Sequence, residues 1–461
     1  MNVGFLTDLL QTVAERGRDV IGRAWPQGSS ASGAVRDVRQ FRSTCDTLLS
    51  RRGEASGVAL AASILAGYRD FDVDERMKAL DALEDAYWPD TEALLAAANA
   101  YQANASAETL SSLQRAAESR RQELIRRLNL APDGTAALVK MREDLLRFDA
   151  GAERWPGLDA DFRHLFMSWF NRGFLVMRRI SWRTPADILD RIIRYEAVHE
   201  IHDWSDLRRR IEPDDRRLFG FFHPQLVDDP LIFVEVALTA RAPVSIGEVL
   251  AEDRDMIAAA DATTAVFYSI SNCQEGLRGI SFGHFLIKQV AEDLKRELPN
   301  LDNFVTLSPA PGFATWLAGA AEADQSLAQA AAEGAWRTDS AEADALAPAL
   351  IAAGARYLAQ AKRVDGRPLD PVARFHLGNG AILDRINWPA DPSDGALRSA
   401  FGLMVNYRYD LSAIELNHEA YAEKSEVIMS SAVRKLLTRK ATRPLKPAKS
   451  ADAAAASEQA A

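Results

Sequence analysis

A short segment with two glycines, RGISFGH at residues 278–284, carries the clearest chemical signal in the sequence. It follows an apolar, β-prone run, TTAVFYSIS (263–271), and leads into HFLIKQVAEDLKREL (284–298), whose apolar residues have helical spacing. The N-terminus of a helix carries unpaired backbone N–H groups and a partial positive charge, and small residues let the backbone approach a phosphate. We therefore expect an anion-binding loop here, although a tight turn between a strand and a helix has the same pattern.

The loop lacks both the GK[ST] ending of a Walker P-loop and the GxGxxG pattern of dinucleotide-binding folds. It resembles the coenzyme A pyrophosphate loop of the acyl-CoA N-acetyltransferase superfamily, whose pattern is [QR]-x-x-G-x-[GA]. Arg278 opens that pattern and Gly283 closes it, whereas Ser281 stands at the middle glycine position. The resemblance implies that the CoA pyrophosphate binds along Arg278, Gly279, Ile280, Ser281, Phe282, Gly283 and His284.

Other residues with chemical potential give weaker signals. His199 and His202 are three residues apart and do not form HExxH, so we do not predict a metal site. Lys288, Lys295 and Arg296 follow the loop, where they would favour the CoA phosphates. The simpler expectation for these three is a solvated helix face.

The first part of the chain, residues 1–185, is predicted to be a helical domain, because strand signals are nearly absent and apolar residues have helical spacing. Ser106 is the predicted N-cap of one helix, and the sequence PDG at 132–134 ends it. The apolar face predicted for this helix consists of Leu110, Leu113, Ala117, Leu124 and Leu128.

After residue 185 the pattern changes to strands and helices in alternation, which is typical of an α/β domain. We predict this domain over 186–442 and a disordered tail over 443–461. The predicted strands are DDPLIFVEVALT (228–239), TTAVFYSIS (263–271), NFVTLSPAPGF (303–313), FHLGNGAILDRINW (375–388) and FGLMVNYRYDL (401–411), with an alanine-rich helix at 319–362.

Composition excludes several classes of protein. A chain of 461 residues with 48% hydrophobic and 26% charged residues is typical of a globular protein with two or three domains. The net charge of -10 argues against nucleic acid as a partner, although one basic pocket could still hold an anion. Two cysteines, Cys45 and Cys273, exclude a disulfide scaffold, and we expect Cys273 to be a buried thiol. Without an apolar run of membrane-spanning length or a secretory core, we expect a cytoplasmic protein with no membrane partner.

Six segments of the chain form a set of long motifs: MSWFNRGFL (167–175), EAVHEIHDW (196–204), FYSISNCQEGLRGISFGHFLIK (267–288), LSPAPGF (307–313), RFHLGNGAILDRINWPAD (374–391) and GLMVNYRY (402–409). Together, in order over roughly residues 140–430, they resemble the malonyl-CoA decarboxylase family. The resemblance implies an α+β protein in which an all-helical domain precedes a catalytic domain with the acetyltransferase (GNAT) fold. It also implies conversion of malonyl-CoA to acetyl-CoA and CO2 with no metal or organic cofactor.

The chemistry requires few protein groups, because the thioester carbonyl accepts the electrons that decarboxylation leaves on C2. The protein must orient the carboxylate, stabilise the enolate oxygen and protonate C2. The resemblance makes His376 the proton donor, an expectation that relies on imidazole titrating near neutrality. It makes Ser308 the dyad partner that holds either the ring or the malonyl carboxylate. Asn379 and Tyr409 are candidates for further polar groups of the substrate site, although core packing or a turn would explain each equally well. An acyl-serine intermediate is disfavoured, because decarboxylation needs no nucleophile and no G-x-S-x-G motif is present.

Two other functions stay open at this point. The fold would also suit a CoA-dependent N-acyltransferase or a non-catalytic acyl-CoA sensor. An acyltransferase has no use for the LSPAPGF and FHLGNGA pair, and a sensor does not need a proton donor at His376. We expect malonyl-CoA as the small-molecule partner and a homo-oligomer, either a dimer or a tetramer, built through the helical domain.

Overall fold

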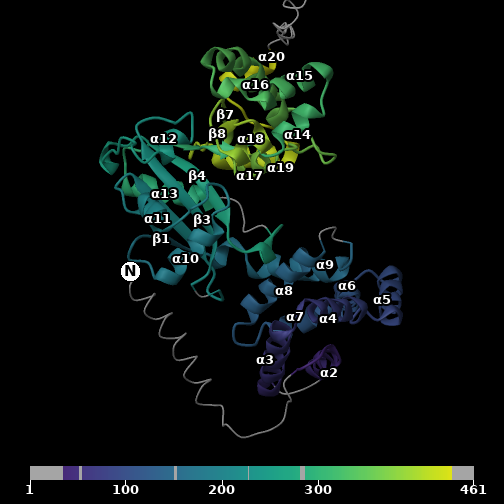
Figure 1. Cartoon of the computed structure of the whole chain (residues 1–461). Coiled ribbons are helices and arrows are strands. Elements are labelled where there is room, and N and C mark those ends of the chain that lie inside the picture. Colours follow the sequence, from purple (N-terminus) through teal and green to yellow (C-terminus); the bar gives the residue numbers. More distant parts are fainter. Residues whose placement is uncertain (1–34, 51–53, 150–152, 227, 281–285, 439–461) are drawn as a thin grey trace, which may run out of the picture. The chain divides into compact units, whose positions relative to one another are not determined.

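The computed structural model describes residues 35–50, 54–149, 153–226, 228–280 and 286–438. The chain divides into two compact units, Met1–Leu165 and Phe166–Ala461. The first is helical and the second combines a sheet with helices, so the predicted order of a helical part followed by a mixed α/β part is confirmed (Figure 1). The predicted disordered tail at 443–461 lies outside the described residues.

The helical unit buries an apolar core that includes Phe41, Ile64, Leu80 and Leu138. Acidic or hydroxyl residues cap several of its helices; Asp72, for example, forms a capping box with Glu75. Its helices are α2 (Val38–Leu49), α3 (Glu54–Asp70), α4 (Val73–Asp85), α5 (Thr91–Ala103), α6 (Ala107–Ala117), α7 (Arg120–Leu128), α8 (Gly134–Phe148) and α9 (Pro156–Trp169).

One predicted helix of this unit is in fact two. Ser106 caps α6 as expected, with its Oγ 3.2 Å from the Thr109 N–H. The chain then leaves the helix at Glu118, and Ser119 caps α7 by accepting the Gln122 N–H. The predicted continuous apolar face is therefore wrong. No residue of α6 is fully buried, whereas Leu124 and Leu128 of α7 are.

In the second unit, eight strands of the described chain form one sheet in the order β1-β2-β3-β4-β5-β8-β6, and β7 pairs with β8. Among these strand pairs, β4–β5 is the parallel one, and the helix α13 (Leu286–Glu297) lies between them in sequence. The strands are β1 (Val176–Ile180), β2 (Arg216–Phe222), β3 (Pro230–Thr239), β4 (Thr264–Asn272), β5 (Asn303–Thr306), β6 (Ser308–Pro309), β7 (Ile382–Asn387) and β8 (Met404–Arg408).

The first two strands correct the sequence analysis. β1 lies within the segment expected to be helical, yet it pairs antiparallel with β2 from Val176↔Phe222 to Ile180↔Leu218. The sheet therefore begins before residue 186. β2 was not predicted either, although every one of its residues is buried.

One helix of this unit replaces the first part of a predicted strand, whose second part is the strand β7. The residues FHLG (375–378) end α17 (Pro371–Gly378), in which Pro371 takes the first turn and Asp370 caps the helix. The alanine-rich stretch breaks at Gly334, which has a φ of +74°. The remaining helices are α10 (Ala186–Tyr195), α11 (Trp204–Ile211), α12 (Gly247–Leu250), α14 (Phe313–Ala318), α15 (Glu322–Glu333), α16 (Ser340–Ala359), α18 (Asp394–Ala400), α19 (Ile414–Lys424) and α20 (Ser431–Thr438). Within the described ranges, no helix has the length and apolar character needed to cross a bilayer.

Candidate active site

The structure brings Ser308 and His376 into hydrogen-bond contact, although 68 positions separate them in the sequence. Ser308 Oγ lies 3.0 Å from Nε2 of His376. Both side chains are buried, with 6% and 2% of their surface exposed. A polar pair in such a water-poor position interacts more strongly than it would at the surface.

Ser308 lies where the regular strand pairing changes from one partner strand to another. β4 and β5 run in parallel only as far as Phe267↔Thr306, and Ser308 then pairs with Val405 of β8 in the short strand β6. Between these points, side chains of β5 and β8 form hydrogen bonds with the backbone of the other strand. The Asn406 amide donates to the Thr306 carbonyl at 2.7 Å, and the Tyr407 N–H donates to Thr306 Oγ1 at 3.1 Å.

His376 occupies the last turn of α17, and both ends of this helix are secured. The buried Asp370 carboxylate accepts the Ala373 N–H at 2.6 Å at the start. At the end, the Asn379 amide donates to the Phe375 carbonyl at 2.7 Å. Gly380 follows with a φ of +79°, and a Cβ there would lie 2.1 Å from the Ile414 carbonyl oxygen. The predicted site residue Asn379 thus caps the helix that carries His376.

The other ring nitrogen of His376 also has a partner. The Tyr409 hydroxyl lies 2.8 Å from Nδ1, so the imidazole is held at both nitrogens. The ring of Tyr407 stacks on the imidazole at 4.6 Å between centroids, with 25° between the planes. Four groups therefore converge here: Ser308, His376, Tyr407 and Tyr409.

The hydrogen bonds assign the proton positions. Thr306 Oγ1 donates to the Val405 carbonyl and accepts from the Ser308 hydroxyl at 2.9 Å. Ser308 Oγ therefore accepts from Nε2, which carries the proton of the neutral ring. Nδ1 is then the acceptor for the Tyr409 hydroxyl, which keeps its proton at neutral pH because burial raises its pKa well above the usual value. The chain of donors thus runs in one direction from Tyr409 to Thr306.

The titration of His376 differs from the expectation. Burial lowers its pKa to about 3, so the imidazole is neutral at pH 7 in the surroundings that the protein provides. The expectation that the ring titrates near neutrality is therefore wrong for the protein alone. The cause is burial of the ring in the core between α17 and β8.

Three of the predicted CoA-loop residues are described. Arg278 and Ile280 flank Gly279, which has a φ of +79° and open space where a Cβ would stand. Glycine is therefore favoured here by the positive φ of the backbone, and not by steric crowding of a Cβ. Ser281, Phe282, Gly283 and His284 lie outside the described residues, and the predicted helix follows as α13.

The basic residues after the loop contact carboxylates. Lys288 lies 2.5 Å from Glu415, Lys295 pairs with Asp302 at 2.8 Å, and Arg296 pairs with Asp293 at 2.9 Å. The solvated-face expectation suits Lys295 and Arg296, which belong to the exposed side of α13.

The two histidines of HEIH do not share a site. His199 is half-buried, and burial lowers its pKa, whereas the His202 side chain is 74% exposed. In the part of the chain that the structure describes, no three His, Cys, Asp or Glu side chains are grouped to hold a metal ion. Cys45 and Cys273 are both buried free thiols, as expected for Cys273.

Two family models match the chain, one after the other. The malonyl-CoA decarboxylase N-terminal domain matches residues 87–170, and the malonyl-CoA decarboxylase C-terminal domain matches residues 173–446. The chain belongs to the malonyl-CoA decarboxylase family. The second match contains Ser308, His376 and Tyr409.

Individual members of the malonyl-CoA decarboxylase family agree with this assignment. The mitochondrial malonyl-CoA decarboxylase of Rattus norvegicus is 35% identical over 342 residues, which is 66% of this chain and 68% of the relative. The crystal structure of the malonyl-CoA decarboxylase from Rhodopseudomonas palustris is 58% identical, with a TM-score of 0.82 over 87% of this chain and 99% of that chain. The structure from Agrobacterium vitis is 53% identical, with the same TM-score over 87% and 100%.

Sequence reasoning missed three residues around the Ser308–His376 pair: Thr306, Tyr407 and Asp370. Two of them could have been found from strand alternation, because Thr306 precedes Ser308 by two positions and Tyr407 precedes Tyr409 by two. Burial raises the pKa of Asp370, the N-cap of α17, to about 7. No residue spacing in the sequence predicts this raised pKa.

Proposed function

We propose that the chain is a carboxy-lyase that converts malonyl-CoA into acetyl-CoA and CO2. The observation that carries this proposal is the buried Ser308–His376 contact, with Tyr409 on the far nitrogen, in a chain of the malonyl-CoA decarboxylase family. In the proposed reaction, the bond between C2 and the carboxylate breaks, and its electrons move onto the thioester oxygen as an enolate. CO2 leaves, and the imidazolium form of His376 gives its Nε2 proton to C2, which returns the ring to the neutral state. In the imidazolium, Nδ1 also carries a proton, which the Tyr409 hydroxyl then accepts.

The low pKa of His376 sets a condition on this mechanism. A malonyl carboxylate beside the ring would bring a negative charge into a buried site, and an opposite charge within about 4–6 Å favours the protonated imidazole. The substrate would thereby raise the pKa that burial lowers to about 3. After CO2 leaves, the enolate replaces the carboxylate as the counter-charge and takes the proton. Each turnover then takes up one proton from solvent, which replaces the proton that C2 received from the ring.

We assign Ser308 an orienting role. Its hydroxyl proton is directed to Thr306 Oγ1, and its lone pairs face the Nε2–H of His376. This is the reverse of the polarity of a nucleophilic serine, whose proton faces the histidine base. Ser308 can therefore accept from the ring or turn toward the malonyl carboxylate, and no acyl-serine step is required.

For the CoA moiety, we propose that the pyrophosphate binds at residues 278–284, before α13. The positive φ of Gly279 and the helix start that follows support this assignment. We further propose that Asn379 acts through α17, since its side chain contacts the Phe375 carbonyl.

We also propose that turnover needs no metal or organic cofactor, because the thioester is its own electron sink. Activity should survive exhaustive EDTA treatment and dialysis. Loss of activity that returns with zinc or magnesium would contradict this.

We propose in addition that the enzyme works in the cytoplasm as a homo-oligomer, a dimer or a tetramer, assembled through the helical unit. Mass photometry of the purified chain tests the assembly.

The deciding experiment incubates the purified full chain with malonyl-CoA and no acceptor amine. We expect acetyl-CoA and CO2 in equal amounts. Turnover that requires an added amine would indicate an acyltransferase. Tight binding without turnover would indicate an acyl-CoA sensor. Either of these results would overturn the proposal.

A further inference from the structure

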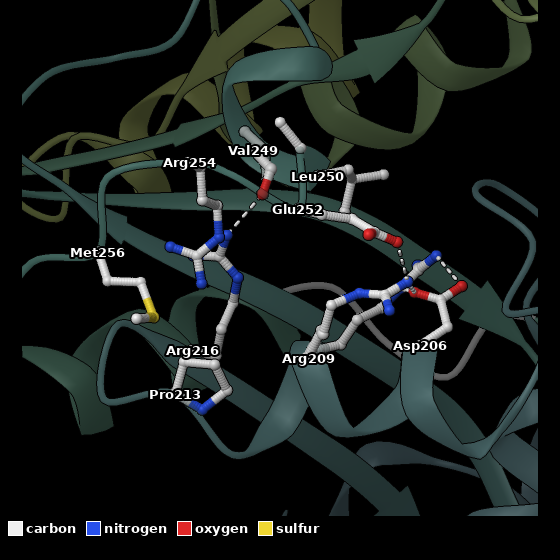
Figure 2. Close-up of a pocket in the computed structure, with 11 residues that line it drawn as sticks. Asp206, Arg209, Pro213, Arg216, Val249, Leu250, Glu252, Arg254 and Met256 are labelled. Carbon is white, nitrogen blue, oxygen red and sulfur yellow. Dashed lines mark hydrogen bonds and ion pairs between the residues drawn. The ribbon is translucent and has the colours of Figure 1, made fainter.

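A small cavity lies away from the dyad, between α11, the start of β2, α12 and the segment that follows α12 (Figure 2). Four guanidinium groups line it, and two carboxylates accompany them at its wall. Its volume of about 100 Å³ holds several water molecules, since one water needs roughly 10–15 Å³ on this measure. The charged lining residues are Asp206, Arg209, Arg210, Arg216, Glu252 and Arg254.

One of the four arginines is fully engaged with the protein. Arg210 donates to the carbonyls of His199 and Glu200 at 2.8 and 2.9 Å. It also contacts the carboxylates of Asp206 and Glu235. All three nitrogens of its guanidinium thus have partners, and we assign Arg210 a structural role in the wall.

Arg216 and Arg254 keep donors that the described residues do not use. Arg216 is 3% exposed; its Nη atoms bond the Asp215 and Val249 carbonyls at 3.0 and 2.5 Å, and its Nε has no acceptor in the described chain. Arg254 grips the Asp215 carboxylate with both Nη atoms, and its Nε likewise has no acceptor there. Figure 2 shows the two guanidinium groups next to each other at the cavity.

The charges around the cavity also favour an added negative charge. The Asp215 carboxylate is shared, because it lies 3.4 Å from Arg216 while it also binds Arg254. Burial lowers the pKa of Arg216, and the charge of Arg254 adds to this effect, while Asp215 and Glu235 oppose it. Behind the wall, burial raises the pKa of Glu235 to about 7, so this carboxylate is only partly ionised at neutral pH.

We propose that this cavity is a binding site for a small oxyanion of the phosphate class, held by Arg216 and Arg254. Guanidinium N–H groups suit the oxygens of a tetrahedral oxyanion, with which they form charge-assisted hydrogen bonds. The cavity admits an ion of about five heavy atoms and excludes a nucleotide. Glu252, whose side chain is 75% exposed and pairs with Arg209, weakens binding from the rim.

The site is separate from the proposed CoA loop. Arg216 pairs with Ala237 of β3, which pairs with Val266 near the start of β4. Residues 278–280 follow the other end of β4. The experiment must still separate the two sites, because inorganic phosphate could also enter a CoA pyrophosphate site.

The test uses the full chain with saturating acetyl-CoA, titrated with inorganic phosphate at constant ionic strength. Calorimetry measures the affinity, and the thermal midpoint gives an independent readout. We expect saturable binding that is at least about tenfold weaker in Arg254→Gln, through loss of the charge-assisted contacts. Glu252→Gln should bind several-fold more tightly, because it removes a repelling charge from the rim.

Arg241→Gln is the matched control. Arg241 is an arginine with a 78% exposed side chain that pairs with Glu248 outside the cavity, so its loss should leave phosphate binding unchanged. If Arg254→Gln fails to fold, the tighter binding of Glu252→Gln still tests the proposal. Equal responses in all variants, no saturation, or binding that acetyl-CoA abolishes would each overturn it.

Discussion

The Tyr409 hydroxyl holds Nδ1 of His376 at 2.8 Å, on the side of the ring opposite Ser308. A neutral tyrosine donates at this position and leaves Nδ1 no proton of its own. The tautomer with the proton on Nε2 is therefore built into the fold before any substrate binds. This bond makes Tyr409 a positioning residue, and its removal has a defined effect.

Tyr409→Phe should lower kcat by about 3–10-fold, the value of one buried hydrogen bond, because the ring is then free to change tautomer. KM should change little. The ¹⁵N chemical shifts of His376 should report a mixed tautomer in the variant and a single one in the wild type. Tyr421→Phe is the control, since the Tyr421 hydroxyl has no hydrogen-bond partner in the described chain. Unchanged kcat and unchanged shifts in Tyr409→Phe would contradict the assignment.

His376→Asn should lower kcat by about 10²–10⁴-fold, because the proton is needed only in the transition state. KM should rise much less. Acetyl-CoA affinity, measured by calorimetry, should be retained and serves as the control for folding. A near-normal kcat would remove His376 as the proton donor and direct attention to Tyr409.

Ser308→Ala should also act mainly on kcat, and the double variant with His376→Asn should be little worse than the worse single variant. Two residues that work through one hydrogen bond lose most of their joint effect when either is removed. Steady-state kinetics of the four proteins give the comparison. Losses that multiply would show that the two residues act separately.

Thr306→Val tests the end of the donor chain. Valine keeps the shape but removes the oxygen that accepts from the Ser308 hydroxyl and the Tyr407 N–H. We expect kcat to fall by about 3–10-fold, together with a lower thermal midpoint. Thr306→Ser restores the oxygen and should restore kcat. If valine lowers only the midpoint and leaves kcat intact, Thr306 supports the strand and not the chemistry.

The buried His376 also predicts a pH dependence of stability. Its folded pKa of about 3 lies below the unfolded value of about 6.5, so between these values the unfolded chain binds a proton that the folded chain does not. Stability from this group is complete above pH 6.5 and falls as the pH drops. Between pH 7 and pH 5, the free energy of unfolding should therefore fall in the wild type by up to about 2 kcal/mol more than it falls in His376→Asn. Thermal midpoints across this range provide the measurement, with the exposed His202→Asn as the control. Parallel curves for His376→Asn and the wild type would contradict a neutral buried ring.

Gly279→Ala tests the CoA loop against a matched glycine. Gly279 and Gly366 have φ values of +79° and +78°, and both have open space where a Cβ would stand. Alanine should cost each site a similar free energy of unfolding, of order 1 kcal/mol, through backbone strain. Only Gly279→Ala should weaken acetyl-CoA binding in calorimetry. Equal affinities in the two variants would remove residues 278–280 from the binding site.

The division into a helical and a mixed unit was predictable, because helical spacing dominates one part of the chain and β-rich apolar runs the other. The sequence pattern did not predict β1 and β2, because arginines at 178, 179, 216 and 217 interrupt their apolar runs. Both strands nevertheless pair over their whole length. The segment FHLGNGA has the apolar pattern of a strand, because a short apolar run does not distinguish strand from helix. Asp370 and Pro371, upstream of it, are the sequence signal for the start of the helix.

The positions of Ser308 and His376 followed from sequence motifs, but their protonation did not. The neutral ring and its tautomer depend on burial and on contacts from β8, and these appear only when the strands are assembled. An imidazole in water is partly protonated near neutrality, whereas the buried ring of His376 is neutral. Thr306 and Tyr407 lie two positions before Ser308 and Tyr409, so strand alternation predicts that each faces the same side as its neighbour.

The close approach of Gly380 to Ile414 affects how the FHLGNGA motif is interpreted in other genomes. A side chain at this glycine would collide with backbone, so the fold demands it whether or not the neighbouring imidazole performs chemistry. A degenerate relative that had lost decarboxylation would still need the glycine to seat α17 against α19. Automated annotation that scores the whole motif would then assign activity to a dead paralogue. Under the proposed mechanism, the residues that would distinguish an active relative are the histidine of FHLGNGA and the tyrosine of NYRY that contacts its ring.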